Sequence, residues 1–270
     1  MLNSILVGQY IPSESFLHRL DPRTKILSMV IMVIAVFTVR QPHEIIMLLA
    51  FTFAAYYFSG LRFMHLYRGM RPLLWLIYFT FILHVLLNKQ GELWLDLYIF
   101  SIYSEGVIQG LLISVRLFIV LFFSTLLTLT TAPLTLTEGV ETLMSPFKKI
   151  LPVHEIALML TISIRFIPTI LRETDKLLKA QTARGGSIGK GSILKQIPHI
   201  VALMIPLLVM SFKRAEELAT AMEARGYRGS EGRSKFKQLH FHWRDYIVTT
   251  MILSVIVVVV YGRFISNLIG

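Results

Sequence analysis

Two arginines occupy matching positions in a repeated pattern. Arg184 and Arg225 each stand between an alanine and a glycine. A planar guanidinium donates several oriented hydrogen bonds into a groove lined with carboxylates or carbonyls, which a lysine cannot do. The chemistry that this pattern predicts is recognition of another protein rather than catalysis. The six residues of the pattern are Ala183, Arg184, Gly185, Ala224, Arg225 and Gly226.

The pattern belongs to a longer internal repeat with an offset of 41 residues, in which Leu177 aligns with Leu218 and Ala180 with Ala221. Each copy predicts a helix that ends at the glycine, the residue that most readily enters the left-handed backbone region. One copy alone is typical of an ordinary capped helix, whose last arginine complements the helix dipole. Two copies in one basic segment favour two equivalent helices that meet two equivalent sites.

The glycine-rich segment 185–192 invites comparison with a phosphate-binding loop. The Walker pattern needs Gly five positions before Gly189 and Ser or Thr directly after Lys190, and those positions hold Arg184 and Gly191. A flexible linker between two helices is the better interpretation. We therefore expect no ATP binding by this chain.

Metal and enzyme chemistry have no support in the sequence. The chain has no cysteine and eight histidines, which excludes disulfides and thiolate metal sites. Only His240 and His242 lie close together, and without carboxylates nearby they are more typical of a wet edge beside the membrane than of a metal site. Paired Asp, Ser/His or His-Glu motifs are missing from the apolar segments, so we expect neither an intramembrane enzyme nor a cofactor.

Composition predicts that these residues belong to an all-α integral membrane protein. Hydrophobic residues make up 54% of the chain and charged residues 16%, against about 25% charged residues in a typical soluble protein. Five apolar runs are predicted to cross the bilayer, where a helix needs roughly 20 residues. They cover residues 26–39, 45–58, 73–87, 107–131 and 246–261, and the first two need flanking residues to reach across.

The loop charges predict the orientation. Residues 61–71 carry three arginines and no acid, whereas residues 89–105 carry one lysine and three acids. Because positively charged loops stay inside, the N-terminus is expected in the cytoplasm and the C-terminus outside. Most of the net charge of +11 lies in residues 145–244, with 17 Lys/Arg against 7 Asp/Glu. The same rule explains this excess, so no nucleic-acid binding is expected.

The basic inner segment is predicted to be a helical cytoplasmic coupling domain with two long coupling helices. Its apolar runs, residues 157–171 and 197–210, are short and interrupted by prolines, which is more typical of interfacial or core helices than of spans. A helix from about His199 to Ala224 would be roughly 40 Å long. The predicted domains are residues 1–131 (membrane helices), 132–244 (coupling domain) and 245–270 (last membrane helix).

Two ionisable residues, Arg116 and His84, lie inside predicted spans and are candidate intramembrane functional residues. A charge within the bilayer is costly and indicates a pathway or a buried partner. For Arg116 two interpretations stay open: a pair with an acid such as Glu138 or Glu141, or contact with a membrane partner.

The sequence resembles the transmembrane T component of energy-coupling factor transporters, which import vitamins and trace metals in prokaryotes. The resemblance rests on the paired Ala-Arg-Gly tips and covers essentially the whole chain. Further matching segments are Ser-Phe-Lys-Arg-Ala-Glu-Glu-Leu at residues 211–218, Arg-Leu-Asp-Pro-Arg-Thr-Lys at 19–25 and Ser-Ile-Arg-Phe-Ile-Pro at 163–168.

The resemblance implies a function and partners. Arg184 and Arg225 would dock on two cytoplasmic ATP-binding subunits, with the flanking alanines and glycines shaping the tips. The membrane helices would embrace an S component that captures the substrate within the lipid bilayer. The complex would lie in the plasma membrane of a prokaryote, and ATP would be bound by the partner subunits rather than by this non-catalytic chain.

The alternative function is a secondary transporter that binds substrate through Arg116 and His84. Such carriers build their sites from broken membrane helices in repeated halves. The repeat of this sequence lies instead in the basic inner segment, so the coupling function is favoured.

Overall fold

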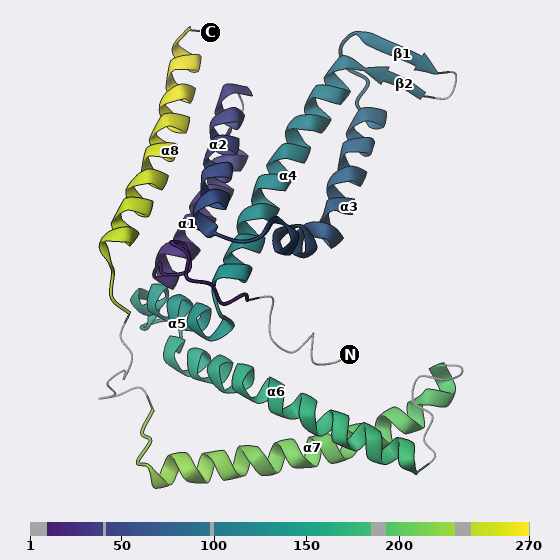
Figure 1. The fold of residues 1–270 in the computed structure, drawn as a ribbon, viewed down its shortest axis with the longest axis vertical. Helices are drawn as coiled ribbons and strands as arrows, with labels where there is room; N and C mark the ends of the chain where they lie inside the picture. The colour runs from purple at the N-terminus through teal and green to yellow at the C-terminus, as the bar shows by residue number, and fades with distance from the viewer. Residues whose placement is uncertain (1–9, 40–41, 98–99, 185–192, 230–238, 270) are drawn as a thin grey trace. The chain divides into compact units, whose positions relative to one another are not determined.

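The structure is a computed structural model that describes residues 10–39, 42–97, 100–184, 193–229 and 239–269. It is mainly helical, as the sequence predicts (Figure 1). The chain forms two compact units, each of which is considered by itself. We call Gln9–Thr142 with Leu239–Gly270 the bundle unit, and Leu143–Gln238 the crossing unit.

Six helices belong to the bundle unit and two long ones to the crossing unit, as far as the chain is described. Those of the bundle unit are α1 (Pro22–Thr38), α2 (Pro42–Ser59), α3 (Phe63–Leu87), α4 (Ser104–Thr130), α5 (Pro133–Leu143) and α8 (Trp243–Ile269). The crossing unit holds a short 3-10 turn (Ser145–Phe147), α6 (Val153–Ala183) and α7 (Ile193–Ala224). The domain boundaries expected at residues 131/132 and 244/245 stay a prediction.

The core of the bundle unit forms around α4, which packs against α1, α2 and α3, while α8 packs against α1 and α2. Two glycines let α3 and α4 approach closely. A Cβ atom on Gly106 would lie 2.9 Å from the carbonyl oxygen of Asn88, and one on Gly110 would lie 3.3 Å from the Cβ of His84. Buried apolar side chains of the core include Met32, Val36, Leu48, Ile119, Phe122 and Leu126.

The start of α3 corrects a prediction. The helix begins at Phe63 and runs through Pro72, so residues 61–71, which we expected to be a loop, mostly form its first turns. Arginines, a glycine and a proline together resemble a loop in sequence, because proline removes a helical hydrogen bond and crowds the preceding turn. Here Leu66 and Met70 are buried, and their packing keeps those turns helical.

A small antiparallel hairpin is a further difference from the prediction of a loop at residues 89–105. Strand β1 (Leu93–Leu97) pairs with β2 (Phe100–Tyr103). The hydroxyl of Ser104 accepts a hydrogen bond from the amide of Glu92 at 3.0 Å and ties the base of the hairpin together.

Four helices in the described part of the chain are long and apolar enough to cross a membrane: α3, α4, α6 and residues 196–224 of α7. Only α3 and α4 were among the five predicted spans. The α1 helix has 17 residues, about 26 Å, against a hydrocarbon layer of about 30 Å. Length and composition therefore do not separate spanning from coupling helices in this chain, because α6 and α7 also carry long apolar windows.

Candidate docking site

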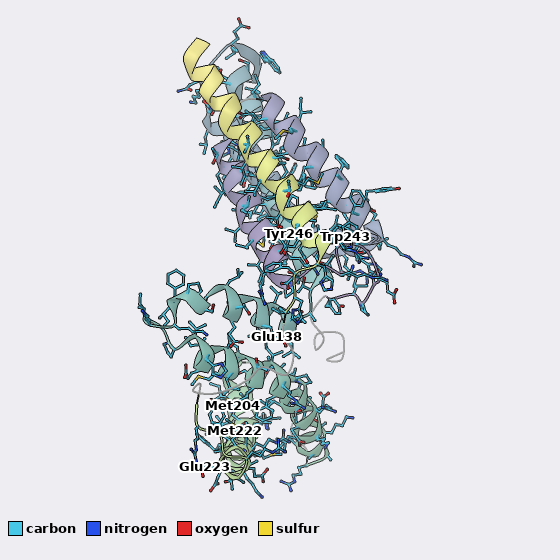
Figure 2. The ribbon with its side chains drawn as sticks, turned by 90° about the vertical axis from the view of Figure 1, so that its left-hand side faces the viewer. Glu138, Met204, Met222, Glu223, Trp243 and Tyr246 are labelled. Atoms are coloured by element: carbon cyan, nitrogen blue, oxygen red, sulfur yellow. The ribbon has the colours of Figure 1, made fainter. Side chains whose placement is uncertain are left out.

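The arginines of the repeated pattern lie at the ends of α6 and α7. These helices have 31 and 32 residues, and they continue through Pro168 in α6 and through Pro206 in α7. Figure 2 looks nearly along the axis of α7. Met204 and Met222 are about five full turns apart and therefore lie on the same side of a continuous helix. In this view they appear close together, as such a helix requires. The α7 helix begins at Ile193, earlier than the predicted His199.

The two helices cross and pack against each other within the crossing unit (Figure 1). At the crossing, Nη2 of Arg214 donates a hydrogen bond to Oε1 of Glu173 at 3.0 Å. Both side chains are partly shielded, with 28% of Arg214 and 21% of Glu173 exposed. The neighbouring side chains that line a small cavity there are Ile170, Leu207, Met210 and Ser211.

The end of α7 is a Schellman motif. Gly226 has a φ of +74°, and its amide donates to the carbonyl oxygen of Glu223 at 2.9 Å. The amide of Tyr227 donates to the carbonyl oxygen of Met222 at 3.0 Å. The predicted helix end at Gly226 is thus confirmed, and Arg225 is the last residue before the chain turns.

The end of α6 matches this arrangement as far as the chain is described. Arg184 is the C-cap residue, and its amide donates to the carbonyl oxygens of Ala180 at 3.2 Å and Gln181 at 3.1 Å. Gly185, which we expected to shape this tip, lies outside the described residues.

Both tips present their arginines to the surroundings. Ala183, Arg184, Ala224, Arg225 and Gly226 are all exposed. Within the described ranges, neither tip guanidinium forms a hydrogen bond or ion pair. A guanidinium held at a helix end without a partner of its own is free to bind a carboxylate or a carbonyl of another molecule.

Arg116 has a backbone partner, which corrects one of the two interpretations left open by the sequence. Its Nη2 donates to the carbonyl oxygen of Val39 at 2.6 Å, where α1 ends, rather than to a carboxylate. Oε2 of Glu138, one of the two acids considered, is buried without a hydrogen-bond partner among the described residues. Contact of Arg116 with a membrane partner stays a prediction.

His84 lies at the contact between α3 and α4. Its Nδ1 is 2.9 Å from the carbonyl oxygen of Thr80, one turn earlier, and its Cβ faces Gly110. This position is that of a packed, locally hydrogen-bonded histidine. The geometry gives His84 and Arg116 different partners, and neither forms part of a polar substrate cluster among the described side chains.

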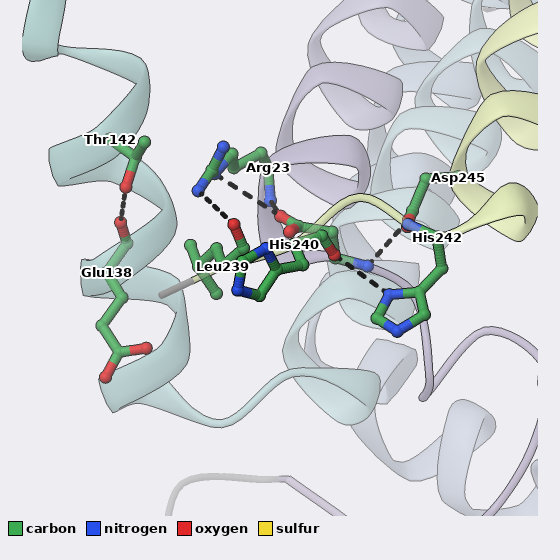
Figure 3. A network of polar contacts seen from close by, with 8 residues as sticks. Arg23, Glu138, Thr142, Leu239, His240, His242 and Asp245 are labelled. Carbon is green, nitrogen blue, oxygen red and sulfur yellow. Dashed lines mark hydrogen bonds and ion pairs between the residues drawn. The ribbon is translucent and has the colours of Figure 1, made fainter. Parts of the chain in front are cut away.

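A buried polar network joins the starts of α1 and α8, and sequence reasoning missed it (Figure 3). Asp245, which is 1% exposed, accepts hydrogen bonds from the amides of Asp21 and His242, both at 2.8 Å. Arg23 donates to the carbonyl oxygen of Leu239 at 3.2 Å. The only signal in the sequence was that Asp21 and Arg23 occur in the segment 19–25 that carries the family resemblance.

Together these features define a class of protein: a helical membrane protein whose exposed arginines sit on two crossing helices and suit protein recognition. Comparison with known proteins gives the family. The family profile described as "Cobalt transport protein" matches residues 13–236.

Three relatives are each named "Energy-coupling factor transporter transmembrane protein EcfT". The chain is 44% identical to the one from Bacillus subtilis (95% of this chain, 96% of the relative) and 45% identical to the one from Brevibacillus brevis (97% and 98%). It is 41% identical to that of Macrococcus caseolyticus (97% and 99%). The chain therefore belongs to the family of energy-coupling factor transporter transmembrane proteins, and is a multi-pass membrane subunit of a transporter. The secondary-transporter alternative is not favoured.

Proposed function

We propose that this chain is the coupling subunit of an ATP-driven importer, and that Arg184 and Arg225 dock two cytoplasmic ATP-binding subunits, one at each helix tip. The observation that carries this proposal is the pair of exposed arginines at the ends of two crossing helices, without partners among the described residues. The stretch that matches the family profile, residues 13–236, includes both tips.

The proposed mechanism uses the two helices as continuous connections from the tips to the rest of the chain. Closure of the ATP-binding subunits on ATP moves the docked tips, and α6 and α7 carry that motion toward a membrane-embedded S component. The S component selects the micronutrient, of the vitamin or trace-metal class. ATP binds to the partner subunits, and this chain needs no cofactor. The crossing unit and the N-terminus face the cytoplasm of a prokaryotic cell, and the C-terminus faces outward.

The proposal is tested by changing both tip arginines in the assembled importer. We expect Arg184→Ala with Arg225→Ala to abolish ATP-driven uptake while the chain still inserts in the membrane. Loss of one partner of a buried, charged hydrogen bond typically costs about 2–5 kcal/mol, so two losses release the ATP-binding subunits on co-purification. Reversal of both charges to Glu should have the same effect.

Lys179→Ala supplies the matched control. Lys179 is an exposed cation of α6, five positions before Arg184, so its removal lowers the positive charge without touching a tip. Uptake and co-purification should stay near those of the unchanged chain. Wild-type uptake with an intact complex in the double tip variant would refute the docking role.

A further inference from the structure

The crossing of α6 and α7 falls at equivalent positions of the internal repeat. Glu173 and Arg214, which form the ion pair, are 41 residues apart. The same offset relates Ala183 to Ala224 and Arg184 to Arg225. The helices therefore meet in matching register rather than at an arbitrary point along their lengths.

This register makes the two arms equal. Each docking arginine follows the crossing residue of its own helix by 11 positions, Arg184 after Glu173 and Arg225 after Arg214. Both stretches are continuous helix up to the last residue, so each arm is about 16 Å long at 1.5 Å per residue. If one helix slid along the other by a single turn, the crossing-to-tip distances would differ by about 5 Å.

The apolar side chains at the crossing specify this register poorly. Leu207 and Met210 on one helix and Ile170 on the other line the contact. Apolar side chains of similar size can replace one another in a contact at small cost, and the flexible Met210 fills irregular gaps. A charged pair is more selective, because each charge buried without its partner costs free energy. Glu173 and Arg214 occupy the same repeat position with opposite charges, so they attract each other in this register alone.

We infer that the Glu173–Arg214 ion pair is a register contact, which sets equal distances from the crossing to the two docking arginines. These two residues position the tips and need not touch a partner themselves. The effect of this contact on transport rests on the proposed function. Its effect on the distance between the two tips does not, because that distance can be measured on this chain alone.

The first test measures the separation of the tips. Because the chain has no cysteine, the exposed and equivalent positions 182 and 223 accept spin labels through Thr182→Cys and Glu223→Cys in the full chain in lipid nanodiscs. We expect one narrow distance distribution. Glu173→Arg or Arg214→Glu alone should broaden or shift it, and the two changes together should restore it.

Two further variants keep this test decisive. Lys176→Ala is the matched control, because Lys176 also approaches Glu173, at 3.8 Å, but from the same helix and with 75% of its side chain exposed; it should leave the distances unchanged. Glu173→Gln removes only the charge, so it can replace a charge reversal that prevents folding. It should broaden the distribution of distances between the two spin labels. Unchanged distances in Glu173→Gln or in a single reversal, or no recovery in the charge exchange, would overturn the inference.

The second test measures coupling in the reconstituted importer. We expect each single reversal to reduce the amount of substrate imported per ATP hydrolysed at least tenfold, with the complex still assembled, and the charge exchange to recover it to within about twofold. A purely structural role predicts parallel losses of assembly and hydrolysis, and that result would contradict the register contact. Failure of the docking proposal is distinguishable, because uptake would then survive loss of Arg184 and Arg225 while the tip distances still responded to charge reversal.

Discussion

At the scale of single residues, Gly226 shows how one backbone angle sets where the exposed Arg225 lies at the end of α7. Its φ of +74° is unfavourable for any residue with a Cβ atom, whereas the space around it is open. Apart from its two chain neighbours, no atom lies within 4 Å of the place that a Cβ atom would occupy. The backbone conformation therefore favours glycine here, whereas a side chain would meet no steric clash. The turn that it makes comes directly after Arg225, the first residue beyond α7.

Replacement of this glycine should loosen the tip of α7. We expect Gly226→Ala to destabilise the Schellman motif by about 1 kcal/mol or more, because alanine is strained at positive φ. Hydrogen exchange at the amides of residue 226 and Tyr227 should become at least about fivefold faster. Gly226→Asn is the control, since asparagine enters the left-handed region more readily, and its exchange should change less. Equal protection in the alanine variant would show that the motif does not hold the tip.

At the scale of elements, the buried network ties the starts of α1 and α8 together within the bundle unit. Asp245 caps its own helix by accepting from His242, and its second oxygen accepts from Asp21 at the start of α1. Lys25 adds a link to the end of α4 by donating to the carbonyl oxygen of Thr130 at 3.0 Å. Three helices far apart in sequence are thus fixed at one end of the bundle unit.

Removal of the central carboxylate should destabilise the bundle unit. In Asp245→Ala the buried amide of Asp21 and the partly buried amide of His242 lose their acceptor, at a cost of about 2–5 kcal/mol together. Asp245→Asn keeps one acceptor oxygen and should lose less. The midpoint of thermal unfolding in detergent should fall in that order.

Glu14→Ala is the comparison for this series. It removes an ion pair with Arg19 in which Glu14 is 91% exposed, and such surface pairs contribute little. Its unfolding midpoint should not change. An Asp245→Ala variant as stable as the unchanged chain would contradict a stabilising role of the network.

At the scale of the whole molecule, the orientation in the membrane decides whether the tips reach cytoplasmic partners. The charge of the loops predicts that the hairpin end of α3 and α4 lies outside and that the start of α3 and the tips of α6 and α7 lie inside. A reagent in the cytoplasm should then reach both helix tips, and it should also reach Arg62 and Arg68 at the start of α3.

Labelling of single cysteines in this cysteine-free chain tests the orientation. In intact cells, a membrane-impermeant maleimide should label Gln90→Cys, beside the hairpin, but not Arg68→Cys or Thr182→Cys. All three positions are exposed, and permeabilised cells, in which all three should react, control for access. External labelling of Thr182→Cys would overturn the cytoplasmic placement of the crossing unit.

The sequence by itself determined the class of fold and the residues of the tips. That the chain is a helical membrane protein is visible in its composition, although composition did not separate the spanning helices from α6 and α7. The helix ends at Arg184 and Arg225 also have a local signal in the sequence, because a glycine cap acts through the few residues beside it. The turn at Gly226 confirms that expectation for α7. The repeat offset of 41 residues could also be found in the sequence. The sequence did not predict that the two helices would contact each other at equivalent positions of that repeat.

Only the tertiary structure decided which distant residues meet. Arg116 bonds a carbonyl 77 residues away and Asp21 bonds a carboxylate 224 residues away, and neither partner has a local signal. The first turns of α3 are helical because Leu66 and Met70 pack into the core, against the loop-like composition around them. The meeting of Glu173 and Arg214 likewise depends on how two helices cross, because an ion pair between helices follows from the packing of both and is encoded in neither alone.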